Sequence, residues 1–84
     1  MEFIPGDRSK ESLKARGLSF ETIIEAIAEN GIAEVYQTEK YPSQIVIVVD
    51  IAGYMHCVPC EPQGSDFRII SGWPSRKHQR KHKP

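Results

Sequence analysis

The stretch that decides the fold is an apolar run near the middle of the chain: Gln44-Ile45-Val46-Ile47-Val48-Val49. Its isoleucines and valines branch at Cβ, which favours an extended backbone. The run shows no alternation of apolar and polar residues, and this is typical of a strand that is buried on both faces. We therefore expect a central strand here, covered on each side by other elements.

Three neighbouring strands are expected at residues 32–37, 54–58 and 67–73. Residues 50–53 would turn the chain from the central strand into the second of these, so that the two strands form a hairpin. Pro59 has no amide hydrogen and indicates an edge, a bulge or the end of a strand. Residues 38–43 and 61–66 are expected to be loops.

The most regular helical pattern covers residues 20–30. Its apolar residues recur at the spacing of one helix face: Phe20, Ile23, Ile24 and Ile27. Ser19 precedes the pattern as a cap, and Gly31 follows it as a stop. Acids recur every four residues on another side of the helix: Glu21, Glu25 and Glu29. We interpret this row as a solvated face or as a strip on which a basic segment docks, including the chain's own C-terminal end.

A shorter helix is expected at residues 10–16, with Ser9 as its cap and Gly17 as its end. Lys10 and Lys14 would lie one turn apart on one face. The predicted fold is therefore α+β: two N-terminal helices packed on a four-stranded, mainly antiparallel sheet, with a basic C-terminal tail or short helix. Residues 1–77 are expected to form a single compact domain, and residues 78–84 a basic tail that is disordered without a partner.

Charge is unevenly distributed along a chain whose net charge is zero. Residues 1–66 hold all 11 acidic residues and only 5 of the 11 lysines and arginines, whereas residues 67–84 hold the other 6 and no acid. Such a basic end suits a phosphate, a nucleic acid or an acidic protein, or it neutralises the acidic part of its own chain. Ser75 could cap a final helix, but residues 76–83 contain no apolar residue, so we expect that helix to order only against RNA or a partner.

The composition favours a small globular protein without a membrane partner. The apolar share of 39% is enough for a core, and no apolar run approaches the length of a membrane span. The first seven residues lack the pattern of a signal peptide. We expect a cytoplasmic protein whose two cysteines do not form a structural disulfide.

The last predicted strand places one cation in the sheet and others just beyond its end. If Phe67, Ile69 and Trp73 face the helices, Arg68 projects from the opposite face. Arg76 and Lys77 follow, and with Arg68 they could converge on a phosphate. Arginine binds phosphate through two parallel hydrogen bonds. The alternative is a solvated strand end.

Histidines and cysteines raise the question of a metal. Cys57-x2-Cys60 and His78-x3-His82 supply four ligands in the order of a zinc finger. Thiols three residues apart on a strand point to opposite faces, so we do not expect zinc or another cofactor. A thioredoxin-like redox site needs a helix after the first cysteine, which Pro59 and Pro62 disfavour. His56 is interpreted as a partly buried structural residue.

Several short motifs follow one another in a familiar order: residues 13–21, the helix with Ile23, Ile24 and Ile27, residues 46–50, Gly53-Tyr54, Val58-Pro59, residues 68–71 and residues 74–77. In this order the chain resembles BrnT-type toxins of bacterial type II toxin–antitoxin modules. The resemblance departs at Ala15-Arg16-Gly17, where these toxins commonly have Lys-His-Gly, and at residues 71–77, which are longer than the usual run.

The resemblance implies a fold akin to RelE-type ribonuclease toxins and a metal-independent endoribonuclease that cleaves RNA and inhibits translation. It also implies a cognate antitoxin, often of the ribbon-helix-helix type. In such an enzyme a ribose 2′-hydroxyl would attack the adjacent phosphate. Arg68 and Arg76, helped by Lys14 and Arg16, would stabilise the phosphorane, and Lys77 or His78 would transfer protons. Further RNA contacts are expected from His78, Arg80, Lys81 and Lys10.

An alternative function is non-enzymatic. In this hypothesis the basic C-terminal segment binds nucleic acid or an acidic protein without cleaving it, and binding falls steeply with salt concentration.

Overall fold

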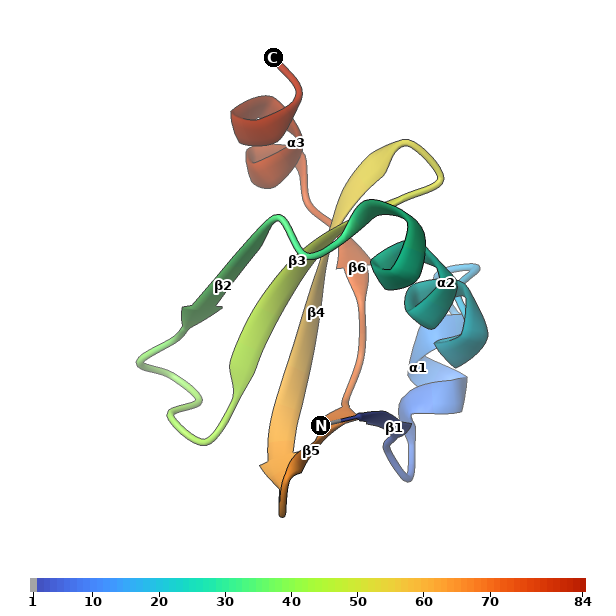
Figure 1. The fold of residues 1–84 in the computed structure, drawn as a ribbon, viewed down its shortest axis with the longest axis vertical. Coiled ribbons are helices and arrows are strands. Elements are labelled where there is room, and N and C mark those ends of the chain that lie inside the picture. Colours follow the sequence, from blue (N-terminus) through green and yellow to red (C-terminus); the bar gives the residue numbers. More distant parts are fainter. Residues whose placement is uncertain (1) are drawn as a thin grey trace.

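The computed structural model describes residues 2–84 and has an α+β fold, in which the helices lie against one sheet (Figure 1). The helices are α1 (Ser9–Lys14), α2 (Phe20–Asn30) and α3 (Arg76–His82). The strands are β1 (Phe3–Pro5), β2 (Glu34–Gln37), β3 (Ile45–Ile51), β4 (Tyr54–Gln63), β5 (Asp66–Ile69) and β6 (Trp73–Pro74).

The sheet has six strands rather than the four expected. Their order is β1-β5-β4-β3-β2, and β6 pairs with β4 alongside this path. β3 and β4 form the predicted hairpin, with Ile45 opposite Cys60 and Ile51 opposite Tyr54. The two additional strands are β1, which runs parallel to β5, and β6, which covers only Trp73 and Pro74. Neither strand is long enough to show an alternating sequence pattern. Each is recognised as a strand only by its pairing with a neighbouring strand.

Pro59 lies inside β4 and does not end it, so that β4 runs on through part of the expected loop at residues 61–66. The carbonyl of Pro59 points away from β3 and accepts a hydrogen bond from the Ile70 amide at 2.9 Å. The ring nitrogen of Pro59 points the same way, into the gap between β5 and β6. A missing amide hydrogen costs no ladder hydrogen bond at that position.

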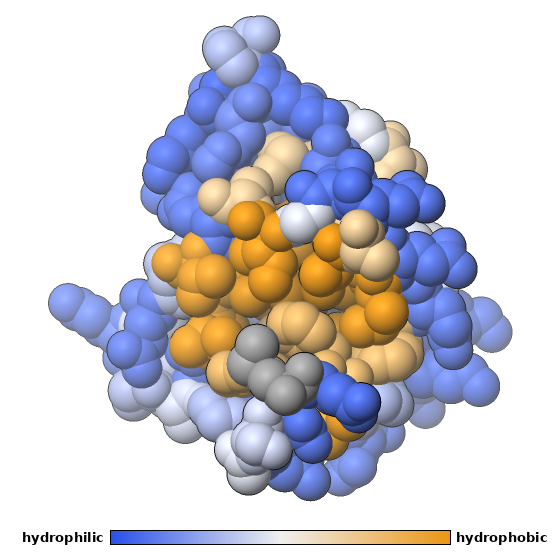
Figure 2. All heavy atoms as spheres, in the orientation of Figure 1, coloured by the Kyte–Doolittle hydropathy of each residue, from blue (hydrophilic) through white to orange (hydrophobic). Residues whose placement is uncertain are grey.

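β3 is buried on both faces, as its sequence predicted. On the first face of the sheet, Ile47 and Val49 pack with Val58 and Ile69 against Leu13 of α1 and Ile23 of α2. On the second face, Val46 and Val48 pack with Met55 and Cys57, flanked by Tyr36 and Trp73. Figure 2 shows apolar residues gathered in one area over the middle of the molecule, with hydrophilic residues around it.

The bounds of α2 and both of its end signals are confirmed. The Ser19 hydroxyl accepts a hydrogen bond from the Thr22 amide, and Gly31 adopts a positive φ of 75° that favours glycine. The shorter helix α1 begins one residue earlier than expected, because Ser9 is its first residue and not its cap. The Ser9 hydroxyl instead donates to the Gly6 carbonyl at 2.9 Å, and the residue is buried.

One expectation for the C-terminal part is corrected, and one of two expected alternatives is observed. Trp73 does not share a face with Phe67 and Ile69, because the strand is interrupted at residues 70–72 and Trp73 then pairs with Cys57 on the second face. Most of the expected tail forms α3, which is the short-helix alternative. Ser75 caps α3 as expected, accepting a hydrogen bond from the His78 amide.

We expect Gly6→Ala to destabilise the fold. The amide of Gly6 donates to the Ile69 carbonyl at 3.0 Å, and a Cβ at this position would lie 2.5 Å from the same carbonyl oxygen. Moving the backbone to relieve this overlap should lower the free energy of unfolding by about 1–3 kcal/mol. Urea denaturation of the two proteins measures this difference in the free energy of unfolding. The control is Lys10→Ala at an exposed position, which should stay within about 0.5 kcal/mol of the wild type; equal stability of the Gly6→Ala protein would contradict the prediction.

Candidate functional site

Helix α3 and the Trp73 side chain of β6 cover only part of the second face, and the uncovered part forms a hollow. Its volume is about 440 Å³. The floor includes Val46 of β3 and Pro59 of β4, and the wall includes Gln44 and Ser71. The hollow is therefore a property of the central hairpin, whose second face is left partly open.

Three aromatic side chains from separate segments line this hollow: Tyr36 of β2, Tyr41 of the loop that follows, and Trp73 of β6. The ring of Tyr41 is the most accessible, with 51% of the residue exposed. Flat rings offer stacking surfaces for planar groups, including nucleic-acid bases. We call Tyr36, Tyr41 and Trp73 together the aromatic hollow.

A cation lies beside two of the three rings. The ammonium of Lys40 is 5.5 Å from the centroid of Tyr41, and the guanidinium of Arg16 is 5.7 Å from the centroid of Trp73. Both are within the range of a cation–π contact. One of these cations, Lys40, belongs to the lining of the hollow, and the other, Arg16, lies against the Trp73 ring.

Behind the third ring lies a cluster that connects β2, β4 and α3. The Tyr36 hydroxyl is 3.6 Å from the Cys57 sulfur, and the Tyr36 ring stacks on His78 at 5.5 Å. Nδ1 of His78 lies 2.8 Å from the Ser75 hydroxyl and 3.4 Å from the Cys57 sulfur. His78 is only 5% exposed, so it anchors α3 on the sheet and is not the solvent-facing RNA ligand that was expected.

Burial governs the protonation of this cluster. It raises the pKa of Tyr36 to about 12, and the contact with Cys57 adds to that effect. It also lowers the pKa of His78, outweighing the opposite influence of Glu34. At neutral pH the phenol therefore keeps its proton and the imidazole is neutral.

Acidic partners of the basic end come from the sheet and not from α2. Glu34 of β2 accepts Lys81 at 2.8 Å and lies 3.0 Å from Nε2 of His82, and these contacts lower the pKa of Glu34. Lys83 pairs with Asp50 at 2.5 Å. Part of the positive charge of residues 67–84 is thus neutralised within the chain. Within residues 2–84 the glutamate row of α2 forms no ion pair.

The structure does not bring Arg68, Arg76 and Lys77 together. Arg68 projects from the second face, as expected, but it pairs there with Glu61 at 3.1 Å. Arg76 follows β6 and lies near His56 and Tyr54, at the other end of β4. Glu61 and His56 are five residues apart on one strand, which corresponds to roughly 16 Å. Lys77 is exposed on α3, so no single phosphate can reach all three cations.

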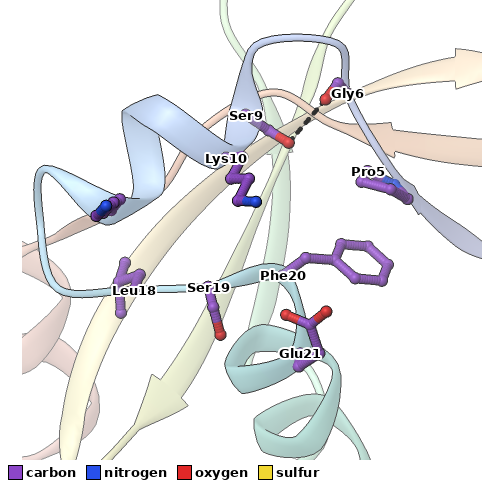
Figure 3. Close-up of a pocket in the computed structure, with 9 residues that line it drawn as sticks. Pro5, Gly6, Ser9, Lys10, Leu18, Ser19, Phe20 and Glu21 are labelled. Atoms are coloured by element: carbon purple, nitrogen blue, oxygen red, sulfur yellow. Dashed lines mark hydrogen bonds between the residues drawn. The ribbon is translucent and has the colours of Figure 1, made fainter.

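The remaining predicted cations lie in different places. Lys10 and Lys14 border a separate pocket of about 370 Å³ between α1 and α2, lined also by Leu18 and Phe20. Figure 3 shows Lys10 extending from α1 toward the residues that begin α2. Arg80 is exposed on α3, and Lys81 is held by Glu34. Of the expected catalytic residues, Arg16 is the one beside the aromatic hollow, through its contact with Trp73.

The four candidate zinc ligands do not converge. Cys57 belongs to the core of the second face and Cys60 to the core of the first, as expected for that spacing on a strand. Both thiols are free and buried, and burial raises the pKa of Cys60 to about 12. Over residues 2–84 no group of three metal-ligating side chains is arranged to hold an ion. His56 is buried and its Nδ1 lies 2.8 Å from the Tyr54 carbonyl, which supports a structural role.

Sequence reasoning did not identify the aromatic hollow. Tyr36 and Trp73 were each assigned to a strand and Tyr41 to a loop, but their common location depends on β6 and on the path of residues 38–44. A weak signal was available, because Lys40-Tyr41 places a cation beside an aromatic residue in a loop.

Comparisons with protein-family models, with curated proteins and with solved structures found no match for this chain. Among the helices formed by residues 2–84, none has the length and apolar content required to cross a bilayer.

Acid is expected to release α3 from the sheet. The pKa of His78 is held below its ordinary value of 6.5, so the released helix takes up a proton more readily than the docked one. The stability from this group is complete above about pH 6.5 and is lost as the pH falls through the lowered pKa. The pKa of Glu34 is also lowered, so its contribution disappears on further acidification.

Amide chemical shifts of residues 76–82, followed from pH 8 to pH 4, measure this release. A His78→Leu variant fills the same buried position with a side chain that cannot be protonated. Its helix should stay docked to a lower pH than that of the wild type. Identical profiles for the two proteins would show that His78 does not control the docking of α3.

Proposed function

We propose that this protein binds single-stranded RNA in the aromatic hollow and that it acts as the ribonuclease toxin of a bacterial toxin–antitoxin module. The observation that carries the binding is the convergence of three aromatic rings, with a cation beside two of them. The resemblance to BrnT-type toxins supports RNA as the ligand, the cleavage activity and a cognate antitoxin as the partner.

The shape and chemistry of the aromatic hollow suit an unpaired strand. Bases in a duplex are stacked on one another, whereas the bases of a single strand can turn out and stack on protein rings. Each such contact contributes about 1–3 kcal/mol and accepts any base. Lys40 and Arg16, each beside one of these rings, would supply positive charge to the phosphates between stacked bases.

Tyr36 and Arg16 would also provide a route for cleavage. The 2′-oxygen would bond to phosphorus and lose its proton to solvent, and the bond from phosphorus to the 5′-oxygen would break, leaving a 2′,3′-cyclic phosphate. Tyr36 retains its proton and, on leaving its contact with the Cys57 sulfur, would donate that proton to the departing 5′-oxygen, after which solvent restores the phenol. Arg16 would stabilise the charge on the phosphorane. The catalytic role would thus belong to Tyr36 and Arg16 and not to Arg68 and Arg76.

A second candidate is a binding module that does not cleave RNA. The observation that favours it is the exposed surface of α3, where Arg76, Lys77 and Arg80 have no acidic partner within residues 2–84. An acidic protein or a nucleic acid would bind this surface mainly through its charge, and binding would weaken steeply as salt is added.

Replacing Tyr41 should weaken RNA binding without affecting the fold. Tyr41 is half exposed, so Tyr41→Ala removes a stacking surface and little of the core. We expect the dissociation constant for a short single-stranded RNA, measured by fluorescence anisotropy, to rise roughly 5-fold to 150-fold. Tyr54→Ala is the matched control, because this tyrosine lies away from the aromatic hollow. Equal affinities of the wild type and Tyr41→Ala for the single strand would refute the binding site. So would a wild-type affinity for a duplex of the same RNA that equals its affinity for the single strand.

Removing one hydroxyl should separate cleavage from binding. Tyr36→Phe keeps the ring that stacks on His78 and deletes only the proposed proton donor. We expect RNA affinity within about 2-fold of the wild type and a cleavage rate lower by about 10²-fold to 10⁴-fold.

Expression of the wild-type chain alone in bacteria tests the toxin assignment. Growth should stop and cellular RNA should be fragmented, and Tyr36→Phe should restore growth. Normal growth with intact RNA for the wild type would exclude the toxin. It would leave the non-enzymatic module as the function if the anisotropy experiment shows binding.

A further inference from the structure

Strand β2 is an open edge of the sheet. It is the last strand in the order β1-β5-β4-β3-β2 and pairs on one side only, with β3. Among the helices and strands of residues 2–84, Figure 1 shows none beside its outer side. Alternate amide and carbonyl groups along that outer side therefore have no partner strand, which makes β2 a template for another chain.

This edge is short, but it lacks several of the other devices that usually protect the edge of a sheet. Natural edge strands are often blunted by lysine, proline or a bulge. β2 consists of Glu34, Val35, Tyr36 and Gln37, which include neither lysine nor proline, and its pairing with β3 is continuous. The one charged residue, Glu34, is already neutralised by Lys81 and His82 of α3. The opposite edge is shorter and contains Pro5.

Exposed apolar side chains are concentrated at the same edge. Val35 is 56% exposed and Ile32, just before the strand, is 39% exposed. Val35 lies on the first face, opposite Ile47, at the margin of the main core. Tyr41, the remaining large exposed apolar residue among those described, follows in the next loop. The surface that a partner strand would cover is therefore also the surface that gains most from leaving water.

We propose that two copies of this chain associate through antiparallel pairing of their β2 strands, so that the two sheets become one. This inference does not depend on the proposed RNA binding. Antiparallel pairing sets the start of each strand beside the end of the other. Ile32 of each copy then lies against residues 38–40 of the second copy, and both exposed apolar residues of the edge are covered.

The charges allow this pairing in two registers. Opposed residues share a face, so three registers keep the two sheets aligned. In these registers Val35 lies opposite Val35, Gln37 or Ala33 of the second copy. The Ala33 register would set Glu34 opposite Glu34 of the second copy, which is unfavourable. The other two registers oppose no like charges. In both of them the two Val35 side chains lie on one face within about 8 Å of each other.

Sedimentation equilibrium on the intact wild-type protein, from about 5 µM to about 500 µM, tests this association. We expect the mass to rise with concentration from the 9.5 kDa of one chain toward twice that value. Val35→Lys adds a charge at the centre of the interface and should keep the protein at the mass of one chain throughout the range. Ala15→Lys, an exposed apolar residue outside β2, is the matched control and should associate like the wild type.

A cross-link gives a second readout that does not require weak association to survive dilution. Cys57 and Cys60 are buried, so a Val35→Cys variant adds a single exposed thiol. A bismaleimide reagent with a spacer of about 8 Å can join the two thiols in either register. It should yield a covalent dimer within minutes, whereas a Glu25→Cys control on the exposed side of α2 should react far more slowly. A wild type that stays at the mass of one chain at every concentration, or Val35→Cys and Glu25→Cys proteins that cross-link equally fast, would overturn the proposal.

Discussion

The requirement that both faces of the β3–β4 hairpin be covered governs this structure. Isoleucine and valine alternate toward the two faces of β3, so neither face can be left to water without a large loss of apolar burial. The chain N-terminal to β3 provides α1 and α2 for the first face, and the chain after β5 provides β6 and α3 for the second. The order of the elements along the chain follows from this division.

Coverage of the second face is unusual because a polar helix provides part of it. α3 has no aliphatic side chain and binds through one buried imidazole, which stacks on Tyr36 and meets Cys57, together with ion pairs to Glu34. A helix with so small an apolar contact is held by specific polar geometry more than by burial. The position of α3 therefore depends on the protonation of the groups that hold it. Because Tyr36 also lines the aromatic hollow, the docking of α3 and the shape of the candidate site share one residue.

Parts of the fold were predictable wherever a local pattern repeats. Helix α2 was predicted to the residue because its apolar stripe, its Ser19 cap and its Gly31 stop agree. β3 was predicted because its unbroken run of β-branched apolar residues is typical of a strand buried on both faces. The alternation of Phe67, Arg68 and Ile69 correctly placed Arg68 on the second face. β1 and β6 were missed because strands of two or three residues are defined only by their partners. The expectation for Trp73 was wrong because the strand is interrupted at residues 70–72. Gly72 signals a break there, but it does not show that Trp73 moves to the other face.

The candidate site was harder to predict for the same reason. Predicted cations were chosen for being close in sequence to the last strand, but Arg68 and Arg76 lie at opposite ends of β4 because the chain runs along most of that strand between them. The aromatic hollow depends on three segments that meet only after β6 has paired with β4. Both the aromatic hollow and the open β2 edge lie where the chain leaves its sheet incompletely covered. A small domain has too little chain to close every surface of a sheet, so these uncovered places are where binding to other molecules costs the least stability.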